Sequence, residues 1–78
     1  MIRLRILTPS SNEEHRTEAV FLPGTAGAFE VLKGHAPLIS TLTAGEIRWR
    51  SGEKEDKMRI RTGIVRVEKD EVTICCEI

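Results

Sequence analysis

Few residues of this 78-residue chain have side chains that commonly carry out chemistry, and their spacing supports none of the usual sites. The only histidines are His15 and His35, and the only cysteines are the neighbours Cys75 and Cys76. Adjacent cysteines cannot join distant parts of a chain, and they lack the spacing of zinc ligands. Neither histidine has a nearby cysteine or aspartate that would complete a metal set. We therefore expect no metal site and no bound cofactor.

Patterns for nucleophilic, acid–base or phosphate chemistry are equally weak. Ser40 and Thr41 lack histidine and aspartate partners in an order typical of hydrolases. Glu13 and Glu14 are neighbours, so an extended backbone directs their carboxylates to opposite sides. Gly24-Thr25-Ala26-Gly27 matches neither glycine-rich phosphate motif, and no helix follows it to bind an anion. The sequence therefore predicts no catalytic residue, and a chain that is not an enzyme by itself.

The histidines and cysteines have simpler structural interpretations. His15 lies among charged residues, and we expect it in a solvated turn. His35 follows Gly34 and precedes Ala36-Pro37 at a tight backbone corner, where an imidazole more often fixes a loop by hydrogen bonds than performs catalysis. Cys75 and Cys76 are expected as ordinary strand thiols, one on each face. This cysteine usage favours a cytosolic environment.

The charged residues balance, with 12 Lys and Arg against 12 Asp and Glu. A neutral chain lacks the footprint of a strong nucleic-acid binder. Several arginines nevertheless fall on the polar faces of strands that look adjacent, with Arg3 and Arg5 as further candidates. These arginines are Arg48, Arg50, Arg59, Arg61 and Arg66. Such a face could bind nucleic acid as small β-barrels do, which is the alternative function. Because no aromatic residue is interleaved with it, a solvated or protein-binding face is favoured.

Alternation of apolar and polar residues runs through the chain and predicts β-strands. Apolar residues occupy every second position at 2–6, 47–49, 58–60, 65–67 and 72–74. Trp49 alternates onto the apolar face, so we expect it in the core. Since helical periodicity never persists, the sequence predicts an all-β fold that closes as a sandwich or a barrel.

Turn residues separate the expected strands. Ser51-Gly52 and Lys69-Asp70 lie between alternating runs and predict hairpin turns. Bends are densest between residues 21 and 40, where Pro23, Gly24, Gly27, Gly34 and Pro37 interrupt short apolar steps. Rigid loops of this kind often present a binding surface, although they serve equally well as purely structural turns.

The length supports one domain, residues 1–78. A domain of this size buries only ~60% of the surface exposed by its unfolded chain, so its stability should be modest. The first residues pass directly into alternation, without the apolar region of a signal peptide. No apolar run approaches the ~20 residues needed to span a bilayer.

Residues 21–48 resemble the epsilon subunit of the rotary F-type ATP synthase. Phe21-Leu22-Pro23-Gly24-Thr25 is similar to the turn that ends the second strand of that family. The segment 27–38 follows its pattern Gly-x-Phe/Leu-x-Val/Ile-Leu/Tyr-x-Gly-His-Ala-Pro-Leu, and 42–48 follows Leu-x-x-Gly-x-Ile/Val-Arg. Residues 63–67 and 72–74 look like its final hairpin. The resemblance thus covers nearly the whole chain, and its Gly-His-Ala-Pro run is highly specific.

This resemblance implies a β-sandwich of two packed sheets with short, mostly antiparallel strands. It implies a non-catalytic rotor subunit of the central stalk, which docks on the gamma subunit and on the polar loops of the c-ring. Such a subunit helps couple proton flow to ATP synthesis within a hetero-oligomeric complex. It would be peripheral, on the cytoplasmic side of the bacterial inner membrane, without cofactor, nucleic acid or membrane insertion.

The resemblance also assigns surface residues by position. The loop that faces the c-ring would consist of Gly27, Ala28, Phe29 and Glu30. The residues that face gamma would be Thr8, Gly34, His35, Ala36, Pro37 and Ser40. Ala28 stands where relatives often have an acidic residue, so a polar contact with the ring would have to come from Glu30. Lys33 replaces the proline that commonly precedes the Gly-His pair, which removes some rigidity from the bend.

Most bacterial members of the family continue into a C-terminal pair of helices that can restrain ATP hydrolysis. The sequence stops at Ile78, after its last expected strand and without a helix-start signal. We therefore expect a natural short form without the inhibitory helices, rather than a truncated chain.

Overall fold

Nine short strands form along the chain, because alternating apolar residues can bury one side of each strand against a common core. The computed structural model describes all residues, 1–78. The strands are β1 (Ile2–Thr8), β2 (Ser11–Thr17), β3 (Ala19–Leu22), β4 (Phe29–Leu32), β5 (Leu38–Leu42), β6 (Gly45–Ser51), β7 (Lys54–Ile60), β8 (Thr62–Glu68) and β9 (Glu71–Glu77). No helix has the length and apolar character needed to cross a membrane.

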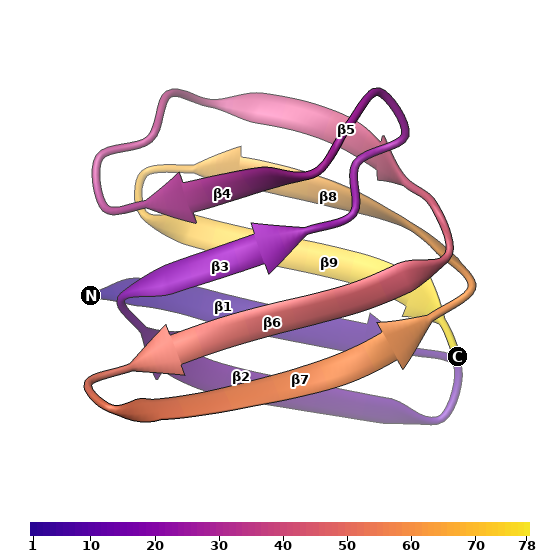
Figure 1. The fold of residues 1–78 in the computed structure, drawn as a ribbon, viewed down its shortest axis with the longest axis horizontal. Helices are drawn as coiled ribbons and strands as arrows, with labels where there is room; N and C mark the ends of the chain where they lie inside the picture. Colours follow the sequence, from indigo (N-terminus) through magenta and orange to yellow (C-terminus); the bar gives the residue numbers. More distant parts are fainter.

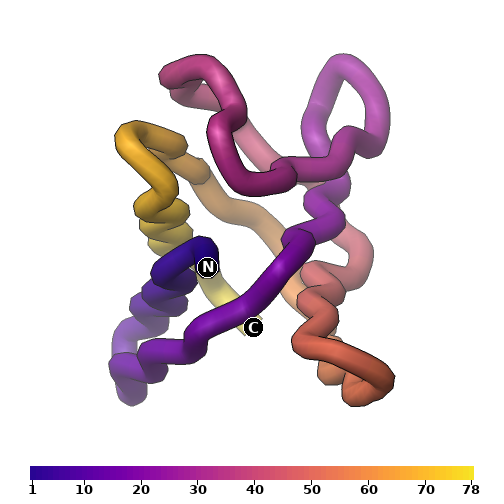
Figure 2. Tube along the Cα trace, turned by 90° about the vertical axis from the view of Figure 1, so that its left-hand side faces the viewer, coloured from indigo at the N-terminus to yellow at the C-terminus, as the bar shows by residue number.

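The strands form two sheets that pack face to face (Figure 1). A five-stranded sheet has the order β2-β1-β9-β8-β5, and a four-stranded sheet has the order β4-β3-β6-β7. Neighbouring strands are antiparallel except for β1 and β9, which run parallel. Figure 2 shows the two layers from the side, with the interior between them. The predicted all-β sandwich of mostly antiparallel strands is confirmed.

The interior is one apolar cluster of 15 buried residues drawn from both sheets. From the five-stranded sheet, Ile2, Leu4 and Ile6 of β1 are fully buried, as the alternation predicts. Trp49 of β6 lies opposite Val20 of β3 and is only 6% exposed. The expected core position of Trp49 is therefore confirmed.

Both expected hairpin turns are present. Gly52 has a φ of 63° in the turn between β6 and β7. Lys69 and Asp70 have φ values of 50° and 62° in the turn between β8 and β9. Two consecutive residues with positive φ are characteristic of the tight turns that match the twist of a β-hairpin. The two-face expectation for the thiols is also confirmed, since Cys75 is exposed and Cys76 is buried.

The expectation of a solvated turn around His15 is wrong. His15 lies within β2, opposite Leu4 of β1, and its ring centroid is 4.9 Å from that of Trp49. Its side chain is 33% exposed, and Nε2 lies 3.0 Å from Glu13 Oε1. As an edge strand, β2 needs only partial burial on its inner side, so its polar residues form a strand without apolar alternation.

Candidate docking surface

The outer face of the five-stranded sheet carries an apolar patch, formed by Leu7, Ile39, Ile64 and Cys75. Ile64 lies opposite Cys75, which in turn lies beside Leu7. Paired residues of neighbouring strands share a face, so these three side chains form a row across β8, β9 and β1. Ile39 extends the patch onto β5 and is 69% exposed, while Ile64 is 46% exposed. Large aliphatic side chains so exposed on neighbouring strands are typical of an interaction surface.

Two shallow hollows flank the apolar patch. One, of about 440 Å³, lies at the end of β1 and is lined by Leu7, Thr8 and Pro9 together with residues of β8 and β9. The other, of about 480 Å³, lies beside β5 and is lined by Pro37, Leu38, Ile39, Arg66, Val67 and Glu68. The patch and both hollows thus form one uneven surface along the sheet.

The residues predicted to face gamma are spread around this surface. The Thr8 hydroxyl lies 2.6 Å from that of Ser11, at the turn between β1 and β2. The loop 33–37 connects β4 to β5 at the other end of the sandwich (Figure 1). Ser40 lies opposite the buried Val65, so its half-buried side chain faces inward at the edge of the sheet. The structure therefore brings Gly34, His35, Ala36 and Pro37 together and places Thr8 far from them.

His35 fixes its own corner, as the sequence predicts. Its backbone N–H donates to the carbonyl of Leu32 at 3.1 Å. Its ring Nδ1 lies 2.7 Å from the carbonyl oxygen of Ala36. The imidazole is thus held against the loop and is only half-buried.

The residues predicted to face the c-ring lie at a different place: Gly27 and Ala28 are on the connection between β3 and β4, and Phe29 and Glu30 begin β4. Ala28, Phe29 and Glu30 line a hollow of about 340 Å³, together with Phe21 of β3 and Pro23, which follows β3. Gly24 packs beneath Phe29, since a Cβ there would lie 2.8 Å from the ring. Gly27 is exposed with a φ of 138°, a conformation that favours glycine. Glu30 lies opposite Phe21 and shares its outward face.

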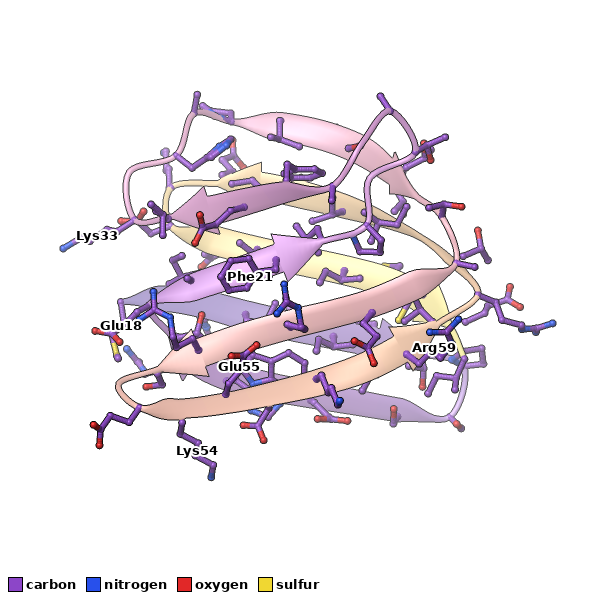
Figure 3. All side chains as sticks on the ribbon, viewed as in Figure 1. Glu18, Phe21, Lys33, Lys54, Glu55 and Arg59 are labelled. Atoms are coloured by element: carbon purple, nitrogen blue, oxygen red, sulfur yellow. The ribbon has the colours of Figure 1, made fainter.

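The expectation that the arginines share one face is wrong. Arg48, Arg50 and Arg59 lie on the four-stranded sheet, whereas Arg66 lies on β8 of the five-stranded sheet with Arg3 and Arg5 on β1. The reason is that the chain changes sheets between β7 and β8, which follow each other in sequence without pairing. Figure 3 shows Arg59 and Glu55 on β7 and Phe21 on β3, two strands of the same sheet that are separated by β6.

Carboxylates also neutralise most of these arginines. Arg48 pairs with Glu55 at 3.2 Å, and Arg50 pairs with Glu18 at 3.7 Å. Arg61 pairs with Glu77 at 3.4 Å, and Arg66 pairs with Glu68 at 3.1 Å. Because the arginines are divided and paired, the nucleic-acid alternative is not favoured.

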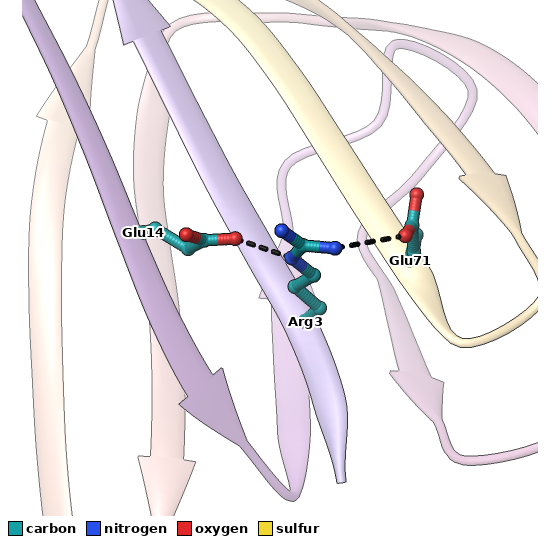
Figure 4. Close-up of polar contacts among 3 residues, drawn as sticks. All are labelled: Arg3, Glu14 and Glu71. Carbon is teal, nitrogen blue, oxygen red and sulfur yellow. Dashed lines mark hydrogen bonds and ion pairs between the residues drawn. The ribbon is translucent and has the colours of Figure 1, made fainter.

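The densest ion network joins three strands of the five-stranded sheet (Figure 4). Arg3 of β1 lies between Glu14 of β2 and Glu71 of β9, with its Nη1 3.4 Å from Glu71. The hydrogen bond from Arg3, with its positive charge, lowers the pKa of the Glu14 carboxyl, and the same contact raises the pKa of Arg3.

The pKa of the Cys76 thiol is raised, first by its burial and then by the neighbouring Cys75.

Replacement of Glu14 by glutamine is expected to reduce the loss of folding stability that accompanies a fall in pH from 7 to 3. A carboxyl whose pKa is lowered by folding stabilises the folded state at pH values above its ordinary pKa of 4.5. This stabilisation is lost as the pH falls through the lowered pKa. Because the pair is exposed, the difference at neutral pH should be small. Urea midpoints measured between pH 7 and pH 3 would test this. The control is Glu53→Gln, in a turn without an ion pair, and equal acid sensitivity of both variants would contradict the prediction.

The side chains capable of chemistry do not converge on one site. No group of three or more His, Cys, Asp or Glu side chains is arranged to hold a metal ion. The hollows are shallow and are lined largely by residues of the sheet surfaces. The fold and these surfaces define a small β-sandwich domain suited to contacts with other macromolecules.

Comparison with known proteins identifies the family. The family model for the ATP synthase Delta/Epsilon chain, beta-sandwich domain, matches residues 1–78, and the chain belongs to this family. An ATP synthase epsilon chain of Cyanothece sp. is 36% identical over 74 residues, which are 94% of this chain and 54% of that protein. One from Desulfitobacterium hafniense is 37% identical over 75 residues, which are 95% of this chain and 57% of that protein. The chain thus spans about half the length of these curated relatives.

Solved structures show the same fold. A chain of the Euglena gracilis mitochondrial ATP synthase, from a structure of OSCP/F1/c-ring, superposes with a TM-score of 0.90 at 23% identity, covering 96% of this chain and 49% of that chain. A chain from the central stalk/c-ring structure of the Tetrahymena thermophila mitochondrial ATP synthase superposes with a TM-score of 0.84 at 10% identity. The match covers 99% of this chain and 63% of that chain. The sandwich is therefore the fold of this family.

Sequence reasoning missed the apolar patch, although a signal for it exists. Val65 and Val67 occupy the inward positions of β8, so Ile64 falls on the outer face. Ile39 likewise follows Leu38, the inward-facing residue of β5 that packs against the core. A large aliphatic residue at an outward position of an alternating strand was the available signal.

Proposed function

We propose that this chain serves as a non-catalytic rotor subunit in the central stalk of a proton-translocating F-type ATP synthase. It docks on the gamma subunit and on the c-ring, and it helps couple proton flow to ATP synthesis. The observation that carries this proposal is the family match over residues 1–78, joined to relatives named ATP synthase epsilon chain. The subunit is peripheral, on the cytoplasmic side of the bacterial inner membrane.

The gamma subunit docks on the outer face of the five-stranded sheet. The apolar patch provides the dry centre that stable interfaces have, and polar groups surround it. Thr8 and Thr41 border the patch, and the ion pair between Arg66 and Glu68 lies beside Ile39. The loop 33–37 completes one end of this surface through Pro37.

The c-ring contacts residues 27–30, which are the end of the connection between β3 and β4 and the start of β4. Ala28 has no polar group, so Glu30 supplies the charged contact from its outward position opposite Phe21. This connection leads into the four-stranded sheet, whereas the apolar patch lies on the other sheet. The chain can therefore hold gamma and the ring at the same time, as a coupling subunit must.

Calorimetric titration of this chain with the gamma subunit of its own organism tests the proposal. We expect saturable one-to-one binding, and no binding to a matched nucleic acid at two ionic strengths. A domain that binds nucleic acid in a salt-sensitive manner, and does not bind gamma, would overturn the proposal in favour of the arginine-based alternative. Addition of the c-ring to the titration detects a site that needs both partners.

Replacement of His35 by alanine is expected to weaken gamma binding and leave the sandwich folded. The ring holds the carbonyl of Ala36 at 2.7 Å and lies outside the core, so its loss should loosen the loop alone. We expect affinity to fall roughly five- to tenfold, the effect of one lost hydrogen bond of about 1 kcal/mol. Unchanged affinity would remove His35 from the interface. His15→Ala, in an edge strand, serves as the control.

A further inference from the structure

The loop 33–37, which contains the Gly-His-Ala-Pro run, is held to the rest of the molecule by one hydrogen bond. The N–H of Gly34 donates to Oδ1 of Asp70 at 2.7 Å. The other hydrogen bonds of this loop are local, from His35 to Leu32 and to Ala36. Asp70 is 36 positions away in the sequence, in the turn between β8 and β9.

Asp70 is well placed to act as a fixed anchor. Its φ of 62° is in the left-handed region, which aspartate tolerates better than most residues. Its backbone carbonyl accepts the N–H of Arg3 at 2.9 Å. A single residue thus connects the start of β1, the turn between β8 and β9, and the loop between β4 and β5.

The anchored loop leads directly into the proposed docking surface. Pro37 and Ile39 line the hollow of about 480 Å³ with Arg66 and Glu68, and the turn that holds Asp70 follows Glu68. Gly34 has a φ of 83°, and a Cβ there would touch nothing within 4 Å. Packing therefore does not restrain the loop at Gly34, and the hydrogen bond to Asp70 does.

We infer that Asp70 is a positioning residue for docking, because its carboxylate holds the loop 33–37 in the conformation that the partner binds. This inference rests on the proposed function, in which the gamma subunit is that partner. A loop that is ordered before binding loses little conformational entropy on docking. Release of the loop would transfer that entropic cost to the binding step.

Two substitutions separate this role from a structural one. Asp70→Gly removes the acceptor but favours the positive φ, so the turn and the melting temperature should be preserved. Asp70→Asn keeps a side-chain oxygen acceptor and tolerance of positive φ. Lys69→Gly makes the same backbone change at the neighbouring position of the turn, where φ is 50°, and leaves Asp70 in place.

The experiment measures amide exchange of Gly34 by NMR, thermal stability, and gamma affinity by calorimetry. For Asp70→Gly we expect faster exchange at Gly34 and an affinity reduced by about tenfold, the cost of ordering one residue. Asp70→Asn and Lys69→Gly should remain close to the wild type in both the exchange rate at Gly34 and the affinity for gamma.

Two results would overturn the inference, and they are distinguishable from failure of the proposed function. If the wild type binds gamma and Asp70→Gly binds it equally, Asp70 does not position the loop for docking. If Gly34 exchanges at the wild-type rate in Asp70→Gly, the hydrogen bond does not hold the loop. If the wild type itself fails to bind gamma even when the c-ring is present, the proposed function fails, and the docking role of Asp70 fails with it.

Discussion

Replacement of Trp49 by alanine is expected to lower the free energy of unfolding by ~3–5 kcal/mol, the usual cost of truncating a buried aromatic residue. Trp49 is 6% exposed, lies opposite Val20, and belongs to the single core cluster. The ring of His15 covers it at 4.9 Å between centroids. Truncation would leave a void that the surrounding strands cannot fill without breaking their ladders.

The effect is large in relation to the stability of so small a domain. A chain of this length is expected to have a total stability of about 4–12 kcal/mol, so the variant should lose a large share of it. The melting temperature should fall by at least ~12 °C, since each kcal/mol corresponds to about 4–8 °C in domains of this size. Circular dichroism is the appropriate probe, because the variant loses the only tryptophan.

Trp49→Phe is the matched control, since it keeps an aromatic ring at the same position. Its loss of stability should be less than half that of the alanine variant. A shift of less than about 1 kcal/mol for Trp49→Ala would be typical of a surface position and would contradict the core assignment.

The sandwich could be predicted from sequence wherever burial is one-sided. In β1, Ile2, Leu4 and Ile6 alternate with outward residues, and the structure buries all three completely. Period-two alternation is a local property, so it identifies strands without knowledge of their neighbours. The turn at Lys69-Asp70 was predictable for the same reason, since its signal lies within a few residues.

Prediction failed where neighbours determine the outcome. β2 has a polar sequence and forms a strand because β1 offers it a free edge along seven residue pairs. The strands that carry the arginines look adjacent in sequence. However, β8 pairs with β9 and β5, so Arg66 lies in a different sheet from the arginines of β6 and β7. Strand order depends on tertiary packing, which periodicity does not encode.

The candidate site shows the same limit. The Gly-His-Ala-Pro run marked the loop, and the resemblance supplied its proposed partner. Its anchor, Asp70, could not be predicted from the run because it lies 36 positions away in another hairpin. The apolar patch likewise arises only when β1, β9 and β8 are placed side by side.

Replacement of Ile64 by lysine is expected to weaken gamma binding by at least about 30-fold, the effect of losing a central interface residue worth ~2 kcal/mol or more. Ile64 lies beside Cys75 in the apolar patch and is 46% exposed in the free domain. Lysine at this position would place a charge in the dry centre of the interface, where its burial is costly. The free domain should change little in stability, since the new side chain can extend into water.

Leu32→Lys provides the matched control, because Leu32 is 49% exposed on the four-stranded sheet. It introduces the same charge at an equally exposed aliphatic position, on the sheet that we do not assign to gamma. Calorimetry should show near wild-type affinity for Leu32→Lys and severe loss for Ile64→Lys, with similar melting temperatures for both. The reverse result would move the gamma interface to the four-stranded sheet. Equal loss in both variants would indicate that net charge, rather than the apolar patch, controls docking.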